Sequence, residues 1–168
     1  MTLRLSLLLG LISLVPCTLQ AQILQDKLEV FAGYSYVRFH NTPSTSQNGW
    51  EVSGQYNWKP WLGGVGDVSG VYGQYGGISI AIHTYLAGPE VNYPWRISPF
   101  AHLLLGAGHR SGSGITDTSF AYALGGGADA RLGYGFSWRV IQYDYLPTHF
   151  FGVKQHNRRI STGIVFRF

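Results

Sequence analysis

The final eleven residues, RRISTGIVFRF, restrict the possible folds more than any other segment of the sequence. Alternate residues of an extended strand share a face. One face of this segment carries Ile160, Thr162, Ile164, Phe166 and Phe168, and the other carries Arg159, Ser161, Gly163, Val165 and Arg167. The pattern predicts a β-strand with one apolar and one polar face. A soluble protein that buries one face also produces such alternation, but the aromatic residue in the last position is unusual.

Residues 1–21 are predicted to be a secretory signal peptide. Arg4 supplies the positive charge, LSLLLGLISLV forms an apolar segment, and Ala21 ends a boundary of small residues. The apolar segment is too short to cross a bilayer as a helix. The chain has one cysteine, Cys17, and it lies in this segment; a lipoprotein interpretation of it is disfavoured by Pro16. The mature domain, residues 22–168, is therefore predicted to have no disulfide, catalytic cysteine or thiolate metal site.

The composition of the chain indicates a strand-rich protein whose outer face contacts lipid. Charged residues make up 12% of the chain, whereas aromatic residues make up 15% and there are 23 glycines. The formal net charge is +4, but the basic residues are scattered singly along the chain. A nucleic-acid surface requires clustered basic residues, so no nucleic-acid partner is predicted.

Seven further segments show alternation of the same kind, with 49–58 the clearest. They are residues 27–39, 49–58, 61–72, 78–91, 97–109, 120–132 and 136–146. In the segment 97–109, three consecutive leucines at 103–105 interrupt the alternation. Longer polar connections at 40–48, 73–77, 110–119 and 147–157 alternate with short turns.

Strands of about ten residues, an even strand number and alternating short and long connections are typical of a transmembrane barrel. Hydrocarbon offers no partners for free backbone N–H and C=O groups, so a sheet in lipid must close on itself. The sequence therefore predicts an all-β fold, an eight-stranded antiparallel up-and-down transmembrane β-barrel with four long loops facing outward. The alternative is a secreted soluble β-sandwich, in which a second sheet buries the apolar face.

An eight-stranded barrel has an interior just wide enough to be filled by side chains. The polar residues predicted to point inward are Glu29, Glu51, Asp67, His83, Asp129, Arg131, Asp144, Arg159 and Arg167. We expect these charges to pair with one another, as buried charges must; a functional conduit is the alternative. Asp144 and Arg159 are expected at similar depth, and Glu29 and Arg167 where the first and last strands meet. The aromatic girdles at the membrane interfaces are predicted to include Trp50, Trp58, Trp61, Trp95 and Trp138.

The segments FAGYSYVRF, GPEVNY, ISPFAHLLLGAGH, YDYLP and RISTGIVFRF together resemble the small OmpA/OmpX-type outer-membrane protein β-barrel domain family of Gram-negative bacteria. The resemblance covers residues 22–168 and implies a bacterial outer-membrane location, after export through a cleaved signal peptide. The family's peptidoglycan-binding domain is not expected in this sequence. The resemblance also implies that the barrel-assembly machinery reads Ile160, Thr162, Ile164, Phe166 and Phe168 as a signal, that periplasmic chaperones assist, and that outer-membrane lipid and lipopolysaccharide surround the barrel.

These observations predict a non-enzymatic protein with a structural or surface-interaction role through the loops at 41–48, 110–119 and 147–157; no catalytic residue, cofactor or metal is assigned. A narrow pore for small solutes is the first alternative. The second is an outer-membrane lipid hydrolase, because His109 and Ser111 resemble the His-x-Ser arrangement of lipid A deacylases, with Asp117 as the candidate acid. The six histidines show no metal-ligand spacing and are interpreted as rim and loop residues. Glycine-rich LGGGADARLG and GGVGDVSG are interpreted as sites of close strand packing.

Overall fold

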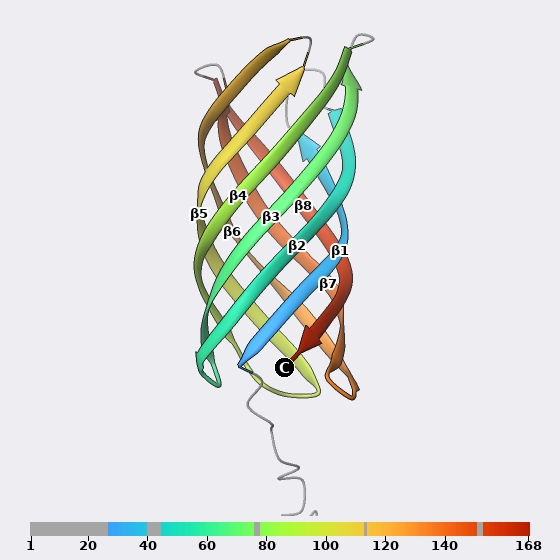
Figure 1. The fold of residues 1–168 in the computed structure, drawn as a ribbon, viewed down its shortest axis with the longest axis vertical. Helices are drawn as coiled ribbons and strands as arrows, with labels where there is room; N and C mark the ends of the chain where they lie inside the picture. Colours follow the sequence, from blue (N-terminus) through green and yellow to red (C-terminus); the bar gives the residue numbers. More distant parts are fainter. Residues whose placement is uncertain (1–26, 40–44, 76–77, 113, 151–152) are drawn as a thin grey trace, which may run out of the picture.

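Eight antiparallel strands form one closed barrel in which each strand pairs with its neighbours in the chain, and β1 pairs with β8 (Figure 1). The structure, a computed structural model, describes residues 27–39, 45–75, 78–112, 114–150 and 153–168. The strands are β1 (Leu28–Phe39), β2 (Thr45–Lys59), β3 (Leu62–Tyr75), β4 (Ile78–Asn92), β5 (Ile97–Gly112), β6 (Ile115–Gly133), β7 (Phe136–Phe150) and β8 (Val153–Arg167). The predicted fold class is confirmed, and the β-sandwich alternative is wrong because the single sheet closes on itself.

We name the two ends of the barrel by the position of the first and last strand ends. The terminal end holds the start of β1, the end of β8 and the turns after β2, β4 and β6, and the distal end lies opposite (Figure 1). Within the described part of the chain, no helix is long and apolar enough to cross a membrane.

The strands are longer at the distal end than the sequence pattern predicted. The segments 41–48, 110–119 and 147–157 were predicted as loops, but β2 begins at Thr45, β5 and β6 cover 97–112 and 115–133, and β7 and β8 cover 136–150 and 153–167. The reason is that polar residues occupy both faces of these strand ends, buried ones such as Gln47 and Asn157 included, so the sequence shows no alternation of apolar and polar residues there. The described parts of these segments are thus paired strand ends; Ser111, for example, pairs with Ala81 of β4 and with Thr116 of β6.

The seam between β1 and β8 is paired along its whole length, from Glu29 opposite Arg167 to Phe39 opposite Asn157. At the terminal end the Phe168 amide donates to the Leu28 carbonyl at 2.8 Å, and the Leu28 amide donates back at 3.2 Å. The barrel therefore has no open sheet edge, as a sheet surrounded by hydrocarbon requires.

Two glycines, Gly33 and Gly163, face each other across this seam. A Cβ atom placed on Gly163 would lie 2.3 Å from the Ala32 carbonyl oxygen and 2.9 Å from the Phe31 ring, which covers the pair from inside. A Cβ on Gly33 would lie 2.6 Å from the same ring. The pair lets Phe31, 1% exposed, pack flat against the inner wall.

A β-bulge in β7 keeps polar residues inside the barrel. The register with both neighbouring strands shifts between Arg139 and Gln142. The two residues in between, Val140 and Ile141, both point outward and are 39% and 49% exposed. The extra residue restores the inward orientation of Gln142, so Arg139 and Gln142 are both buried.

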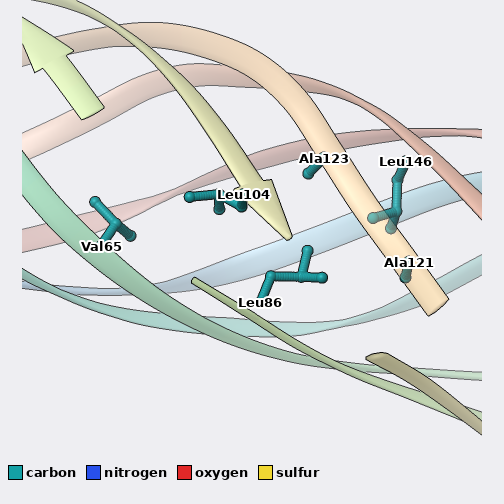
Figure 2. Packing of buried hydrophobic residues seen from close by; sticks show 6 residues of the cluster. All are labelled: Val65, Leu86, Leu104, Ala121, Ala123 and Leu146. Atoms are coloured by element: carbon teal, nitrogen blue, oxygen red, sulfur yellow. The ribbon is translucent and has the colours of Figure 1, made fainter. Parts of the chain in front are cut away.

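Apolar side chains fill two parts of the interior. One cluster, from strands β3 to β7, consists of Val65, Leu86, Leu104, Ala121, Ala123 and Leu146 (Figure 2). The other lies toward the distal end on β1, β3 and β4; we call Val37, Phe39, Val71, Ile80 and Ile82 the distal apolar cluster. The remaining interior is mostly polar and charged, with Phe31, Phe100 and Val165 among the polar residues.

Candidate functional site

The alternation of the strands places almost all the acidic side chains in the barrel interior. The buried charged residues are Glu29, Glu51, Asp67, Glu90, Asp129, Asp144, Arg139, Arg159 and Arg167. The remaining described acidic residue, Asp117, lies on the inward-facing side of β6, four positions before buried Ala121. No acidic side chain of the described residues therefore belongs to the outward face.

Arg159 is the centre of one ion cluster, and its side chain is 0% exposed. Its Nη1 lies 2.9 Å from Asp67 Oδ1, its Nη2 2.7 Å from Asp144 Oδ2 and 3.4 Å from Glu51 Oε1. Nη1 also donates to Ser69 Oγ at 3.1 Å. A residue of β8 thus connects β2, β3 and β7 across the barrel, and three carboxylates share one guanidinium.

Neutral side chains add hydrogen bonds to this cluster. The Gln142 amide donates to Glu51 Oε1 and Asp144 Oδ2, both at 2.8 Å. The Ser161 hydroxyl donates to the second oxygen of Glu51. Satisfied hydrogen bonds are what make buried charges tolerable, because an uncompensated one costs several kcal/mol, about 3–5 when one partner is removed.

His102 joins the Arg159 cluster from β5, and its interpretation as a rim or loop residue is wrong. It is 5% exposed; Nε2 lies 2.8 Å from Asp144 Oδ1 and Nδ1 3.3 Å from Glu90 Oε2. The leucine run 103–105 obscured its orientation in the sequence. In the structure the alternation continues through the run, because Leu104 is 0% exposed while Leu103 and Leu105 are 44% and 52% exposed.

A second ion cluster lies at the terminal end beside the seam. Arg167 Nε is 2.8 Å from Glu29 Oε2 and Arg167 Nη2 is 3.1 Å from Asp129 Oδ2. Asp129 also accepts from Arg139 Nε at 2.9 Å. Asn57 donates to the second Glu29 oxygen at 2.9 Å. These contacts join β1, β2, β6, β7 and β8.

Arg139 is a central interior residue that the sequence analysis did not identify. Its guanidinium carbon lies 4.4 Å from the Phe31 ring centroid and 4.2 Å from the Phe100 centroid, so it is held between two aromatic rings. It also donates to Gln142 Oε1 at 2.7 Å, which links the two ion clusters. A strict two-residue period from Ile141 predicts that Arg139 points outward; the bulge reverses this.

Two residues predicted to belong to the charged interior are not buried there. Arg131 is exposed at the terminal end of β6, beside the second register shift with β7, where the strand has passed the buried layer. His83 is on the outward face, where Nε2 lies 3.3 Å from the Tyr72 hydroxyl. The isoleucines of β4 take the inward positions instead, with Ile80 and Ile82 9% and 6% exposed.

Glycines of LGGGADARLG make room for the ion clusters. A Cβ atom on Gly125 would lie 1.9 Å from Asp144 Oδ1, and one on Gly127 would lie 2.9 Å from the Phe100 ring. Both glycines are on the inward face of β6. Small residues on one strand therefore allow large or charged side chains from β5 and β7 to fill the narrow interior.

The outward face is aromatic and aliphatic. The five tryptophans predicted as girdle residues are all exposed: Trp50 38%, Trp58 62%, Trp61 49%, Trp95 62% and Trp138 45%. Trp58, Trp61, Trp95 and Trp138 lie in or near the turns of the terminal end. Trp50 lies farther along β2, covers Gly70 of β3 and donates from Nε1 to the Tyr72 hydroxyl at 3.3 Å.

The residues of the hydrolase alternative do not form a catalytic arrangement. His109 and Ser111 lie on the outward face of β5, and His109 Nδ1 is 2.7 Å from Thr118 Oγ1. Asp117 is adjacent to Thr118 in β6 and therefore points to the opposite face of the sheet. An acid on the opposite face cannot orient the histidine as a base for Ser111.

Within the described ranges, no group of three or more histidine or carboxylate side chains is placed to hold a metal ion. The geometry therefore defines a closed antiparallel barrel with an apolar outer face and a charged, filled interior. These are the features of a small transmembrane β-barrel.

Comparison with known proteins agrees with this class. The structure of Neisserial surface protein A is similar with a TM-score of 0.73 and 12% sequence identity, covering 84% of this chain and 97% of that one. Ail, the attachment invasion locus protein of Yersinia pestis, gives 0.58 and 19%, covering 83% and 97%. The N-terminal β-barrel domain of Pseudomonas aeruginosa OprF gives 0.51 and 9%, covering 85% and 98%. The predicted small outer-membrane barrel fold is thus confirmed.

Neither the family models nor the curated protein sequences contain a match to this chain. The likeness is therefore one of fold, carried by structure at low sequence identity.

Proposed function

We propose that this chain is a non-enzymatic integral protein of the bacterial outer membrane, with a structural or surface-interaction role at its distal end. The observation that carries the proposal is the closed barrel, whose outward face is mainly apolar and whose buried charges are paired inside. An apolar outward face on a barrel with no second sheet or helix to cover it suits a lipid environment.

The lengths of the strands support a surface role for the distal hairpins. A tilted transmembrane strand needs about 9–11 residues, whereas β5 has 16 and β6 has 19. The excess lies in the distal segments, where polar residues occupy both faces. Rigid hairpins that extend beyond a bilayer present surface for contacts with other molecules. The names of two similar barrels, a surface protein and an attachment invasion locus protein, support this role.

The proposal includes the partners that the sequence suggested. Outer-membrane lipid and lipopolysaccharide would contact the outward face, and the barrel-assembly machinery would read the β8 face of Ile160, Thr162, Ile164, Phe166 and Phe168, with periplasmic chaperones keeping the unfolded chain soluble. Export would use the signal peptide at residues 1–21, which lies outside the described residues.

Electrophoretic mobility tests the barrel in its membrane. We expect the protein, extracted from outer-membrane fractions, to migrate differently in detergent gels before and after boiling, because a closed sheet of paired strands resists detergent until heated. A protein that fractionates with the periplasm, or that shows one mobility under both conditions, contradicts the proposal.

Epitope insertion tests the orientation. A tag inserted at Gly114, in the distal turn between β5 and β6, should be labelled by antibody on intact cells. The matched tag at Tyr134, in the terminal-end turn between β6 and β7, should be labelled only after the outer membrane is permeabilised. The reverse pattern would place the distal hairpins in the periplasm and remove the surface role.

A further inference from the structure

Two arginines face each other on the outer surface of the barrel. Arg38 of β1 and Arg158 of β8 are directly opposite in the seam register, both are on the outward face, and both are exposed. Directly opposite side chains on one face have Cβ atoms about 4.5–5.5 Å apart, and like charges in such a pair destabilise the sheet. An anion bound between the two guanidinium groups would relieve this repulsion.

The protein does not supply this anion from its described residues. All the acidic side chains in the described ranges lie on the inward-facing side of their strands, so none reaches the two guanidinium groups through the sheet. An anion that pairs with these two arginines would therefore come from the surroundings of the barrel.

Hydroxyl groups extend the arginine pair into a polar row. Ser46 of β2 is opposite Arg38, and Tyr145 of β7 is opposite Arg158, so the row Ser46, Arg38, Arg158 and Tyr145 crosses four adjacent strands. Ser46 Oγ also accepts from the Tyr36 hydroxyl at 2.8 Å. Guanidinium groups flanked by hydroxyls match the oxygens of a phosphate, which arginine binds in bidentate fashion.

The residues one step toward the terminal end are apolar or aromatic. Ile160 lies between Tyr36 and Tyr143 on the same outward face, two residues along each strand from the polar row. A ligand bound here would contact the two arginines with one end and an apolar surface, on the side toward the terminal end of the barrel, with the other. That is the polarity of a membrane lipid with its phosphate at the arginines and its acyl chains along the barrel.

We propose that Arg38 and Arg158 form a binding site for the phosphate of a lipid headgroup in the outer leaflet, on the seam between the first and last strands. The inference rests on the proposed function, because it needs the barrel in a membrane with its distal end outward. It goes further by assigning the lipid contact to one pair of residues and one chemical group.

The test measures lipid binding by the full mature chain folded in dodecyl maltoside, an uncharged detergent without phosphate. Native mass spectrometry follows titration with diphosphorylated lipid A and with the same lipid stripped of its phosphates. We expect the phosphorylated lipid to bind more tightly, and the R38Q/R158Q variant to lose about 5-fold per arginine, the effect of one basic residue near an anionic lipid surface. The matched control K59Q/R96Q removes two charges at the terminal end and should bind as wild type does.

Three results would overturn the inference. The first is that R38Q/R158Q binds lipid A as tightly as wild type does, and the second is that the dephosphorylated lipid binds as tightly as the phosphorylated one. The third is that millimolar inorganic phosphate displaces the lipid, which would indicate a site for a free anion. If the double variant fails to fold, the Nε–H resonances of Arg38 and Arg158 in wild type keep the inference testable, because both must shift on addition of lipid A and not of its dephosphorylated form. A folded, heat-modifiable protein with unchanged binding contradicts only this inference, whereas a wild-type chain that forms no such barrel contradicts the proposed function.

Discussion

At the scale of single residues, Arg158 and Arg159 show how one position along a strand decides the surroundings of a side chain. Arg158 is exposed on the outward face, whereas Arg159 is fully buried and contacts Asp67, Asp144 and Glu51. Neighbours on a strand point to opposite faces, so two arginines side by side in the sequence have unrelated energetic roles.

Substitution of these neighbours should separate the two roles. Arg159→Ala leaves three carboxylates buried around an empty space, and removing one partner of a buried ion pair costs about 3–5 kcal/mol. Arg158→Ala removes an exposed side chain and should leave the free energy of unfolding close to that of wild type. Urea unfolding in phosphatidylcholine vesicles measures both; equal destabilisation by the two variants would show that the Arg159 cluster contributes nothing specific.

Most interior charges can be found from the sequence, but not all. Alternation identified Asp144 with Arg159 and Glu29 with Arg167 at matching depths, and the structure has ion pairs of 2.7 Å and 2.8 Å there. Arg139 was missed because a one-residue bulge changes the phase of β7, and the short signal of a bulge is not readable in a single sequence. His102 was missed because three leucines hide the period of β5.

At the scale of strands, alternation in the sequence locates the part of a strand that has an apolar outward face. It does not locate the strand ends beyond that part. The strand ends above the predicted membrane have polar residues on both faces, as in Ser46 to Asn48 of β2. Such segments have the composition of loops, and their pairing is decided by the neighbouring strand rather than by their own pattern. The loops at the distal end were for this reason predicted too long.

The seam of β1 and β8 should depend on its glycine pair. Gly163→Val places a branched side chain where a Cβ atom already lies 2.3 Å from the Ala32 carbonyl oxygen, so we expect a loss of about 1–3 kcal/mol from overpacking. Gly54→Val is the matched control, since a Cβ atom there meets nothing within 4 Å. Urea midpoints and the boiled and unboiled gel mobilities check the prediction, and it is wrong if both variants fold and unfold alike.

At the scale of the whole molecule, the filled interior argues against the alternative that the protein is a narrow pore. The distal apolar cluster and the Arg159 cluster lie along the same interior, and an eight-stranded barrel leaves little room beside them. The fold class follows from the sequence because alternation recurs in most of the predicted strands. The role of the protein does not, since a scaffold shared by many proteins carries its function in side chains at the ends.

Planar-bilayer recording should therefore find no stable open level for the wild-type barrel. Water and ions would have to pass the side chains that fill the interior, among them the distal apolar cluster and the buried side chains of Gln47 and Asn157 beside it. The double substitution Phe39→Ala and Ile82→Ala removes the bulk of that cluster and should raise the frequency of current steps. Stable, long-lived conductance of a correctly folded wild type would contradict this account of the interior.

The contacts of Arg159 have a mechanical consequence. A thin tube fails by flattening, and it flattens when opposite walls move independently of each other. Here one guanidinium on β8 contacts carboxylates on β2, β3 and β7, so strands that are not neighbours in the sheet are held together across the interior. We therefore expect the cross-section of the barrel to stay round under the lateral pressure of a tightly packed bilayer.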